Sequence, residues 1–433
     1  MTTMTPEHKA ITAIWRMEGA KIIATVTRMV RDVGLAEELA GDALVAALET
    51  WPDAGTPDNP AAWLTATAKN RALDYLRRQK MQAEKHETLG LDLEAMEANI
   101  VPDYFDVRAA SEDDPIGDDL LRLMFISCHP VLSTEARVAL TLKLIGGLST
   151  EEIARAFLVA ETTIAQRIVR AKRTLSESRT PFELPPAAEL GTRLASVLEV
   201  IYLVFNEGYT ATSGEHWTRP ELVDEALRLG RILAELAPDA AEVHGLVALM
   251  ELQASRIAAR ADAEGRPVLL LAQDRHRWDQ LLIRRGLLAL ERAEKLGGTL
   301  GPYALQAAIA ACHSRARVAE ETDWGRIAAL YDALSQVAPS PIVELNRAVA
   351  VSMAFGPAAA LEIVDRLMAD AQLQSYHWLP SVRGDLLDKL GRHAEARGEF
   401  ERAATMTRNA RESEMLMERA EALTRRLDGH SVH

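Results

Sequence analysis

One face of a predicted helix near the middle of the chain carries side chains suited to contacting DNA. Its hydroxyl, amide and guanidinium groups recur at helical spacing and belong to Thr162, Thr163, Gln166, Arg170 and Arg173, with Arg167 on the flank. The opposite face is apolar and consists of Ile164, Ile168, Ala171 and Leu175. No acidic residue occurs between Thr162 and Ser176. Side chains of these types hydrogen-bond to base edges in the major groove, so this face is a candidate DNA-reading surface.

A second, shorter helix is predicted directly before this one. Ser149 and Glu152 have the spacing of a capping box, which starts a helix by satisfying two backbone N–H groups reciprocally. Two short helices joined by a tight turn are typical of a helix-turn-helix, in which the second helix enters the major groove. The alternative is an ordinary helical hairpin with a solvated basic face.

A third helix, predicted over residues 61–80, carries another group of polar side chains. Trp63, Asn70, Asp74 and Arg77 lie on one side, and six basic residues fall between Lys69 and Lys85. Aromatic rings, amides and a cationic track are what single-stranded bases and their backbone require. The alternative, favoured for Trp63, is that this ring belongs to the core and the arginines are only solvated.

Composition favours an all-α protein that acts in the cytoplasm. The 433 residues are 48% hydrophobic and 26% charged, aromatics make up 5%, and no alternating β-branched run is present. There is no signal peptide and no apolar run of about 20 residues, so no membrane role is expected. Cys128 and Cys312 lie too far apart for a metal motif. The net charge of −14 argues against a DNA-binding protein, but the acidic residues are concentrated in one segment.

Changes in composition predict three domains and a linker. Residues 1–85 form a first helical domain, with helices at 8–31 and 36–51, a proline-rich loop at 52–60 and the helix at 61–80. Residues 86–119 form a mostly unpacked acidic linker; from Glu87 to Asp119 it contains eleven acidic residues and one arginine. Residues 120–182 contain the helix-turn-helix, and residues 183–433 form a larger helical domain.

The larger domain shows weak repetition and no catalytic motif. Gly384, Leu387, Gly391, Ala396, Phe400 and Ala403 match most of a tetratricopeptide repeat, and Trp324–Pro339 matches half of one. Chemically suggestive residues are scattered through it: Asn206–Tyr209, His216, Asp274, His276, Trp278, His313 and Tyr376–Trp378. None has metal-binding or nucleophile spacing, so no enzyme, cofactor or metal is predicted. A ligand-binding cavity remains open as an alternative to core and surface roles.

The first two domains resemble the extracytoplasmic-function sigma factors, small specificity subunits of bacterial RNA polymerase in the sigma-70 family. Three segments look like sigma region 2: residues 36–44 (AEELAGDAL), 60–64 (PAAWL) and 68–78 (AKNRALDYLRR). Residues 147–173 look like region 4. The larger domain is similar to the tetratricopeptide-like extension of one sigma-factor group, through residues 124–130, 205–210 and 274–279.

The resemblance implies a role for each group of residues. Leu39 and Asp42 would dock on the clamp helices of the polymerase β′ subunit, and the helix-turn-helix domain on the β flap. The loop 52–60 would capture a flipped base. The −10 element would be contacted by Lys69, Asn70, Arg71, Arg77 and Arg78. The −35 element would be read by Glu161, Thr162, Thr163, Gln166, Arg167 and Arg170, with Arg173 on the same face. In three places the chain departs from the family pattern: Leu158 and Ala160 in the turn, and Ala165 where many relatives have lysine.

The sequence therefore predicts an all-α sigma factor that binds RNA polymerase core and promoter DNA. Its own C-terminal domain, rather than a separate anti-sigma factor, would regulate it. Two alternatives remain. One is a helix-turn-helix activator with a helical-repeat sensor domain that binds duplex DNA without polymerase; the other is an enzyme within the extension.

Overall fold

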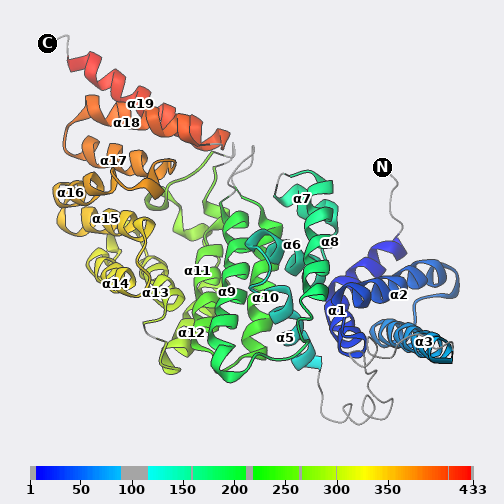
Figure 1. Ribbon diagram of the computed structural model, residues 1–433. Coiled ribbons are helices and arrows are strands. Elements are labelled where there is room, and N and C mark those ends of the chain that lie inside the picture. Colours follow the sequence, from blue (N-terminus) through cyan, green and yellow to red (C-terminus); the bar gives the residue numbers. More distant parts are fainter. Residues whose placement is uncertain are drawn as a thin grey trace. The chain divides into compact units, whose positions relative to one another are not determined.

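The computed structural model describes residues 6–88, 116–157, 159–210, 218–262, 266–298, 300–407 and 409–430. These residues form helices joined by turns and loops, with one isolated bridge between Ala261 and Pro267 and no strand in the described ranges, which confirms the all-α prediction. The chain divides into two compact units, Met1–Ile201 and Tyr202–His433. The boundary falls inside helix α9 (Ala187–Tyr209), which therefore contributes residues to both units (Figure 1).

The first unit is built from helices of very different length. They are α1 (Pro6–Val30), α2 (Val33–Ala54), α3 (Pro60–Thr88), α5 (Ile116–Ser127), α6 (Thr134–Leu144), α7 (Thr150–Ala156), α8 (Glu161–Glu177) and the first part of α9. Helix α1 packs against α2, α3 and α5, and its fully buried Ile22 and Val26 belong to this core.

The ends of α2 and α3 differ from the predicted ones. The break between α1 and α2 falls at residues 31–32, and α2 begins at Val33 rather than at residue 36 because Asp32 is its N-cap and accepts a hydrogen bond from the Leu35 N–H at 2.8 Å. Helix α2 continues through Pro52 to Ala54, because the buried Trp51 holds its last turn in the core, so the loop covers only residues 55–59. Helix α3 runs on to Thr88 through residues with high helix propensity.

The capping box before α7 is confirmed. The Ser149 N–H donates to Glu152 Oε2 at 2.8 Å, and the Glu152 N–H donates to Ser149 Oγ at 3.0 Å. Ala160 occupies the N-cap position of α8 and makes no side-chain cap, as its methyl group requires. Leu158, the other unusual turn residue, lies outside the described residues.

Most of the acidic segment 86–119 also lies outside the described residues. Its last residues belong to α5, and there the unpacked interpretation is wrong. The side chain of Asp119 is 1% exposed and forms ion pairs with Arg28 at 3.3 Å and Arg122 at 2.8 Å. The buried carboxylate is thus neutralised by two guanidinium groups, a pairing that composition alone does not reveal.

The second unit consists mainly of consecutive helices packed against their neighbours in the chain. They are the last residues of α9, α10 (Pro220–Leu236), α11 (Ala241–Ala254), α12 (Gln280–Lys295), α13 (Pro302–Arg315), α14 (Trp324–Val337), α15 (Pro341–Phe355), α16 (Pro357–Leu367), α17 (Trp378–Lys389), α18 (His393–Met406) and α19 (Ala410–His430). Figure 1 shows α14 to α19 stacked one after the next, from yellow to red. A Cβ on Gly384 would lie 3.0 Å from the Phe400 ring, so the close α17–α18 crossing indicated by the repeat pattern is present.

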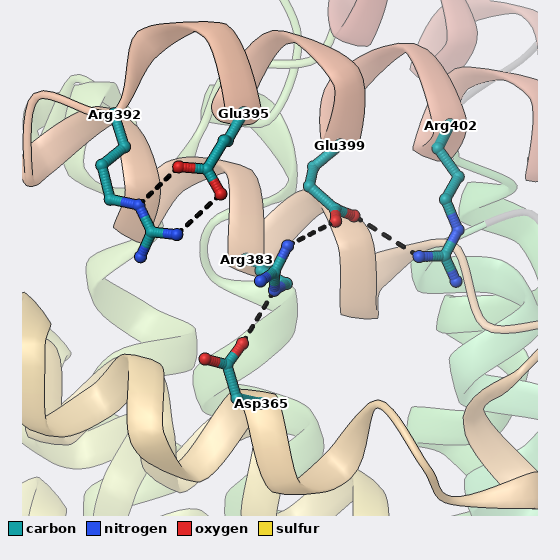
Figure 2. A network of polar contacts seen from close by, with 6 residues as sticks. All are labelled: Asp365, Arg383, Arg392, Glu395, Glu399 and Arg402. Carbon is teal, nitrogen blue, oxygen red and sulfur yellow. Dashed lines mark hydrogen bonds and ion pairs between the residues drawn. The ribbon is translucent and has the colours of Figure 1, made fainter.

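A network of ion pairs links three of these helices (Figure 2). Arg383 on α17 donates to Asp365 on α16 at 2.8 Å and to Glu399 on α18 at 2.7 Å. Arg402 approaches Glu399 from the other side at 3.5 Å. Each partly buried charge here has a partner of opposite sign, which helps to hold neighbouring helices in register.

Candidate nucleic-acid interface

Helix α8 presents most of its predicted DNA-reading side chains to solvent. Glu161, Thr162, Gln166, Arg170 and Arg173 are exposed, and Thr163 and Arg167 are half-buried. The apolar face is 1–5% exposed, in agreement with the sequence pattern, and consists of Ile164, Ile168, Ala171 and Leu175. It packs against α6 and α7, so the short hairpin holds α8 with its polar face outward.

Helix α3 carries the second predicted group. Lys69, Asn70, Arg77 and Arg78 are exposed. Arg71 is half-buried and donates to Asp42 Oδ2 on α2 at 3.3 Å. The structure thus brings together one residue predicted to bind DNA and one predicted to bind polymerase. Their side chains are 41% and 51% exposed, so solvent screens the pair and each remains accessible.

The predicted polymerase contacts lie on an outward face of α2 that is larger than expected. Asp42 is exposed, whereas Leu39 is half-buried. Glu38, Val45 and Glu49 are also exposed, and with Asp42 they have the i, i+4, i+7, i+11 spacing of one helical face. Val45 is 51% exposed. Sequence reasoning missed it, although an apolar residue between acidic ones on the same face was the available signal.

Two tryptophans flank the short loop at 55–59. The rings of Trp51 and Trp63 pack edge to face with centroids 5.3 Å apart. Trp51 is buried and Trp63 is half-buried, so the core interpretation of Trp63 is only partly right. The pair holds the ends of α2 and α3 together on either side of this loop.

A third side of α8 contacts α2 within the first unit. Lys172 forms an ion pair with Glu37, which also lies 3.7 Å from the Lys143 Nζ on α6. Burial lowers the pKa of both lysine ammonium groups. Arg16 on α1 pairs in the same way with Glu152 on α7. These contacts leave the outward face of α8 uncovered.

The described residues contain no group of histidine, cysteine and carboxylate side chains arranged to hold a metal ion. None of their helices is long and apolar enough to cross a membrane.

Comparison with protein-family models assigns these helices. Residues 14–81 match sigma-70 region 2, and residues 122–175 match sigma-70 region 4. Residues 193–294 match a family of unknown function, DUF6596. The chain belongs to the sigma-70 family, in its extracytoplasmic-function group. The region 2 match therefore covers most of α1–α3, and the region 4 match runs from within α5 into the last turn of α8.

Relatives named as sigma factors support the same assignment, and one uncharacterized relative matches over nearly the whole chain. An uncharacterized protein of Rhizobium meliloti, R00370, is 44% identical over 392 residues, which cover 90% of each chain. The probable ECF RNA polymerase sigma factor SigI of Mycobacterium tuberculosis is 26% identical over 183 residues, 42% of this chain and 59% of that protein. The ECF RNA polymerase sigma factor SigK of Mycobacterium sp. KMS is 26% identical over 170 residues, 37% of this chain and 77% of that one. Sigma factors initiate transcription and are not enzymes.

Proposed function

We propose that this sigma factor recognises promoters through the outward faces of α3 and α8. Lys69, Asn70, Arg71, Arg77 and Arg78 would contact the −10 element. Glu161, Thr162, Thr163, Gln166, Arg167, Arg170 and Arg173 would read the −35 element. The observation that carries this proposal is the division of α8 into a buried apolar face and an exposed face of threonine, glutamine and arginine. The hydroxyl, amide and guanidinium groups of that face can hydrogen-bond to base edges in the major groove. A helix face that only contacts solvent does not require these residue types.

The outward face of α2 is the proposed polymerase contact. Asp42, with Leu39 beside it and Val45 on the same face, would dock on the β′ clamp helices, and the region 4 domain would dock on the β flap. An apolar side chain ringed by acidic ones is suited to a partner surface that is basic and partly apolar. Since polymerase works in the bacterial cytoplasm, we place the protein there.

Promoter binding would require the two sigma regions to separate. The −10 and −35 elements lie about 25 base pairs apart, which is roughly 85 Å of duplex at 3.4 Å per base pair. Region 2 and region 4 cannot both reach their elements while Lys172 is in contact with Glu37. Separation would also break the packing of α1 on α5, where Arg28 pairs with the buried Asp119, and the pair between Arg16 and Glu152, so docking on polymerase would have to offset the loss of all these contacts.

We further propose that the extension regulates transcription without a separate anti-sigma factor. The supporting feature is α9, whose N-terminal half packs on the region 4 domain. Arg193 donates to the Phe125 carbonyl at 3.0 Å, and Ser196 Oγ donates to the Cys128 carbonyl at 3.0 Å. The same helix continues into the second unit. A change in the extension would therefore reach region 4 through a single helix.

The test is transcription in vitro with purified core polymerase and genomic DNA of the source bacterium, with transcript ends mapped by sequencing. The full chain should produce a defined set of starts that share −10 and −35 elements. The truncated form should end at Ile201, because residues 187–201 pack in the first unit. An unchanged output from that form would contradict regulation by the extension. A full chain that binds duplex DNA equally well without polymerase would favour the activator alternative.

A further inference from the structure

Three arginines surround two buried aromatic rings in the second unit. Arg260 Cζ lies 3.7 Å from the centroid of the Tyr209 ring, and Arg275 Cζ lies 4.8 Å from that of Trp278. Arg256 Cζ lies 5.9 Å from both rings. Tyr209, Arg256 and Trp278 are 9%, 8% and 3% exposed. We call these five residues the arginine–aromatic cluster; they come from the end of α9, both flanks of the 3-10 helix η2 (Ile257–Ala259), and the 3-10 helix η4 (Arg275–Arg277) with the residue after it.

The cluster carries more positive than negative charge. Within the described parts of the chain, neither Arg256 nor Arg275 forms an ion pair with a carboxylate. Arg275 donates instead to neutral oxygens, the carbonyls of His313 and Ala316 and the hydroxyl of Thr322, at 2.5, 2.8 and 3.1 Å. The carboxylates that act on the cluster from a greater distance are Glu320 and Glu321, toward Arg275, and Glu412, toward Arg260.

Elsewhere in this unit, partly buried guanidinium groups are paired directly. Arg231 contacts Glu251 at 2.7 Å, and Arg383 contacts Asp365 and Glu399 (Figure 2). The buried carboxylate of Glu412 acts on Arg260 electrostatically, but it is in direct contact with His377 Nε2 at 3.0 Å. Burying a cation without a counter-ion is unfavourable, so the exception at the buried Arg256, with the half-buried Arg275 beside Trp278, calls for a compensating negative charge.

Two neighbouring groups register this positive field. Burial, followed by the charges of Arg256 and Arg275, lowers the pKa of His313 to about 3. Burial by itself would raise the pKa of the Tyr209 phenol, but Arg256 and Arg260 outweigh that effect and the pKa lies below its ordinary value. In both groups the charge of Arg256 shifts the pKa downward, the direction that an excess of positive charge produces.

Buried nitrogen atoms at the same place lack hydrogen-bond partners among the described residues. They are Arg256 Nε, Arg275 Nε, Trp278 Nε1 and His313 Nδ1. Trp278 and His313 are more than nine-tenths buried. Leaving buried donors unsatisfied costs free energy, and an acceptor bound at the cluster would satisfy several of them at once.

From this geometry we propose that the arginine–aromatic cluster binds a small oxyanion, the phosphate or carboxylate group of an anionic metabolite. Guanidinium groups match the geometry of either group with two parallel hydrogen bonds, and the aromatic rings exclude water from the pairing. The site accounts for the signature segments 205–210 and 274–279 of the extension, which promoter recognition leaves without a role. Binding at this site is a property of the second unit and does not depend on the extension regulating transcription.

Titration calorimetry on the full chain tests the proposal, with inorganic phosphate in one arm, acetate in the other and chloride keeping ionic strength constant. We expect saturable one-to-one binding in at least one arm, and the arm that binds identifies the group. Arg256→Gln should weaken it at least tenfold, whereas Arg284→Gln, an exposed arginine on α12, should leave it unchanged. No saturable binding in either arm overturns the proposal, as does binding that Arg256→Gln leaves intact.

A second measurement on the native chain avoids dependence on the fold of that variant. Ultraviolet difference titration against Tyr209→Phe isolates the ionisation of Tyr209. A bound oxyanion should raise the apparent pKa of this phenol, because it neutralises Arg256 and Arg260. If Tyr209 ionises near neutral pH and neither oxyanion changes this, the phenolate is itself the counter-charge and the proposal fails.

Discussion

The arginines of α8 and those of the arginine–aromatic cluster are the same residue type in opposite surroundings. Arg170 and Arg173 are exposed and hydrated, and Arg173 pairs with the equally exposed Glu177 at 2.6 Å. Arg256 is 8% exposed and has already lost most of its water. An exposed cation contributes little to stability and is free to contact the phosphates and base edges of a long polyanion. A buried cation costs stability unless a counter-charge is enclosed with it, which suits a small anion.

The largest expected effect is on the exposed side. Arg170→Glu removes a hydrogen-bond donor and adds a charge that phosphates repel. Each of these two changes should cost ~1–2 kcal/mol of binding free energy, so transcription from −35-dependent promoters should fall about 100-fold. Binding to core polymerase in the absence of DNA should not change. Arg425→Glu, an exposed reversal on α19, is the matched control in run-off transcription. Simultaneous loss of polymerase binding would contradict the separate roles of α2 and α8.

A smaller effect, on the free energy of unfolding, distinguishes an arginine that has carboxylate partners from one that has none. Arg383→Met leaves Asp365 and Glu399 without their shared partner, so the free energy of unfolding should fall by about 2 kcal/mol. Arg256→Met removes a cation that has no carboxylate partner in the described residues and should cost less than about 1 kcal/mol in buffer free of oxyanions. Urea unfolding of both full-length variants measures the difference. Equal losses would mean that Arg256 is compensated after all.

The burial of His313, together with the charges of Arg256 and Arg275, should also appear in the pH dependence of stability. His313 is neutral in the fold and protonates near its ordinary pKa of 6.5 when unfolded, so its folded pKa of about 3 makes the unfolded chain bind more protons between these values. This contribution to stability is complete above pH 6.5 and is lost as pH falls toward 3. Between pH 6 and 4 the native chain should lose about 1 kcal/mol more per pH unit than His313→Gln. The same slopes in both unfolding series would mean that the pKa of His313 is not lowered in the folded chain.

The smallest effect concerns the ion pair between α8 and α2. Lys172→Gln removes one of the two lysine partners of Glu37, and partly exposed pairs of this kind are worth roughly 0.5 kcal/mol. Affinity for core polymerase without DNA should rise about two- to threefold, because separating the sigma regions becomes easier. Arg173→Gln, on the outward face of the same helix, provides the control in a fluorescence-anisotropy titration. An unchanged affinity for Lys172→Gln would mean that this contact does not restrain opening.

Local pattern was a reliable guide where one helix face has one environment. The alternation in Thr162–Leu175 predicted both which residues of α8 are buried and which are exposed, because a 3.6-residue period maps directly onto a helix surface. Pattern was less reliable at helix ends and for single aromatic or acidic residues. Sequence reasoning placed Pro52 in a loop, Trp63 in the core and Asp119 in a linker, but each depends on tertiary packing. Trp51 is buried next to Pro52, Trp63 packs against the Trp51 ring, and Asp119 pairs with Arg28.

The sequence by itself determined the all-α architecture, the helix-turn-helix and the family resemblance, since these depend on residue type and short-range spacing. Only the tertiary structure decided which charges are paired. It joined Arg71 to Asp42 and Lys172 to Glu37, and it gathered Arg256, Arg260 and Arg275 around Tyr209 and Trp278. Sequence spacing cannot show this, because charges interact through space and their energies depend on burial, and both are properties of the packed chain.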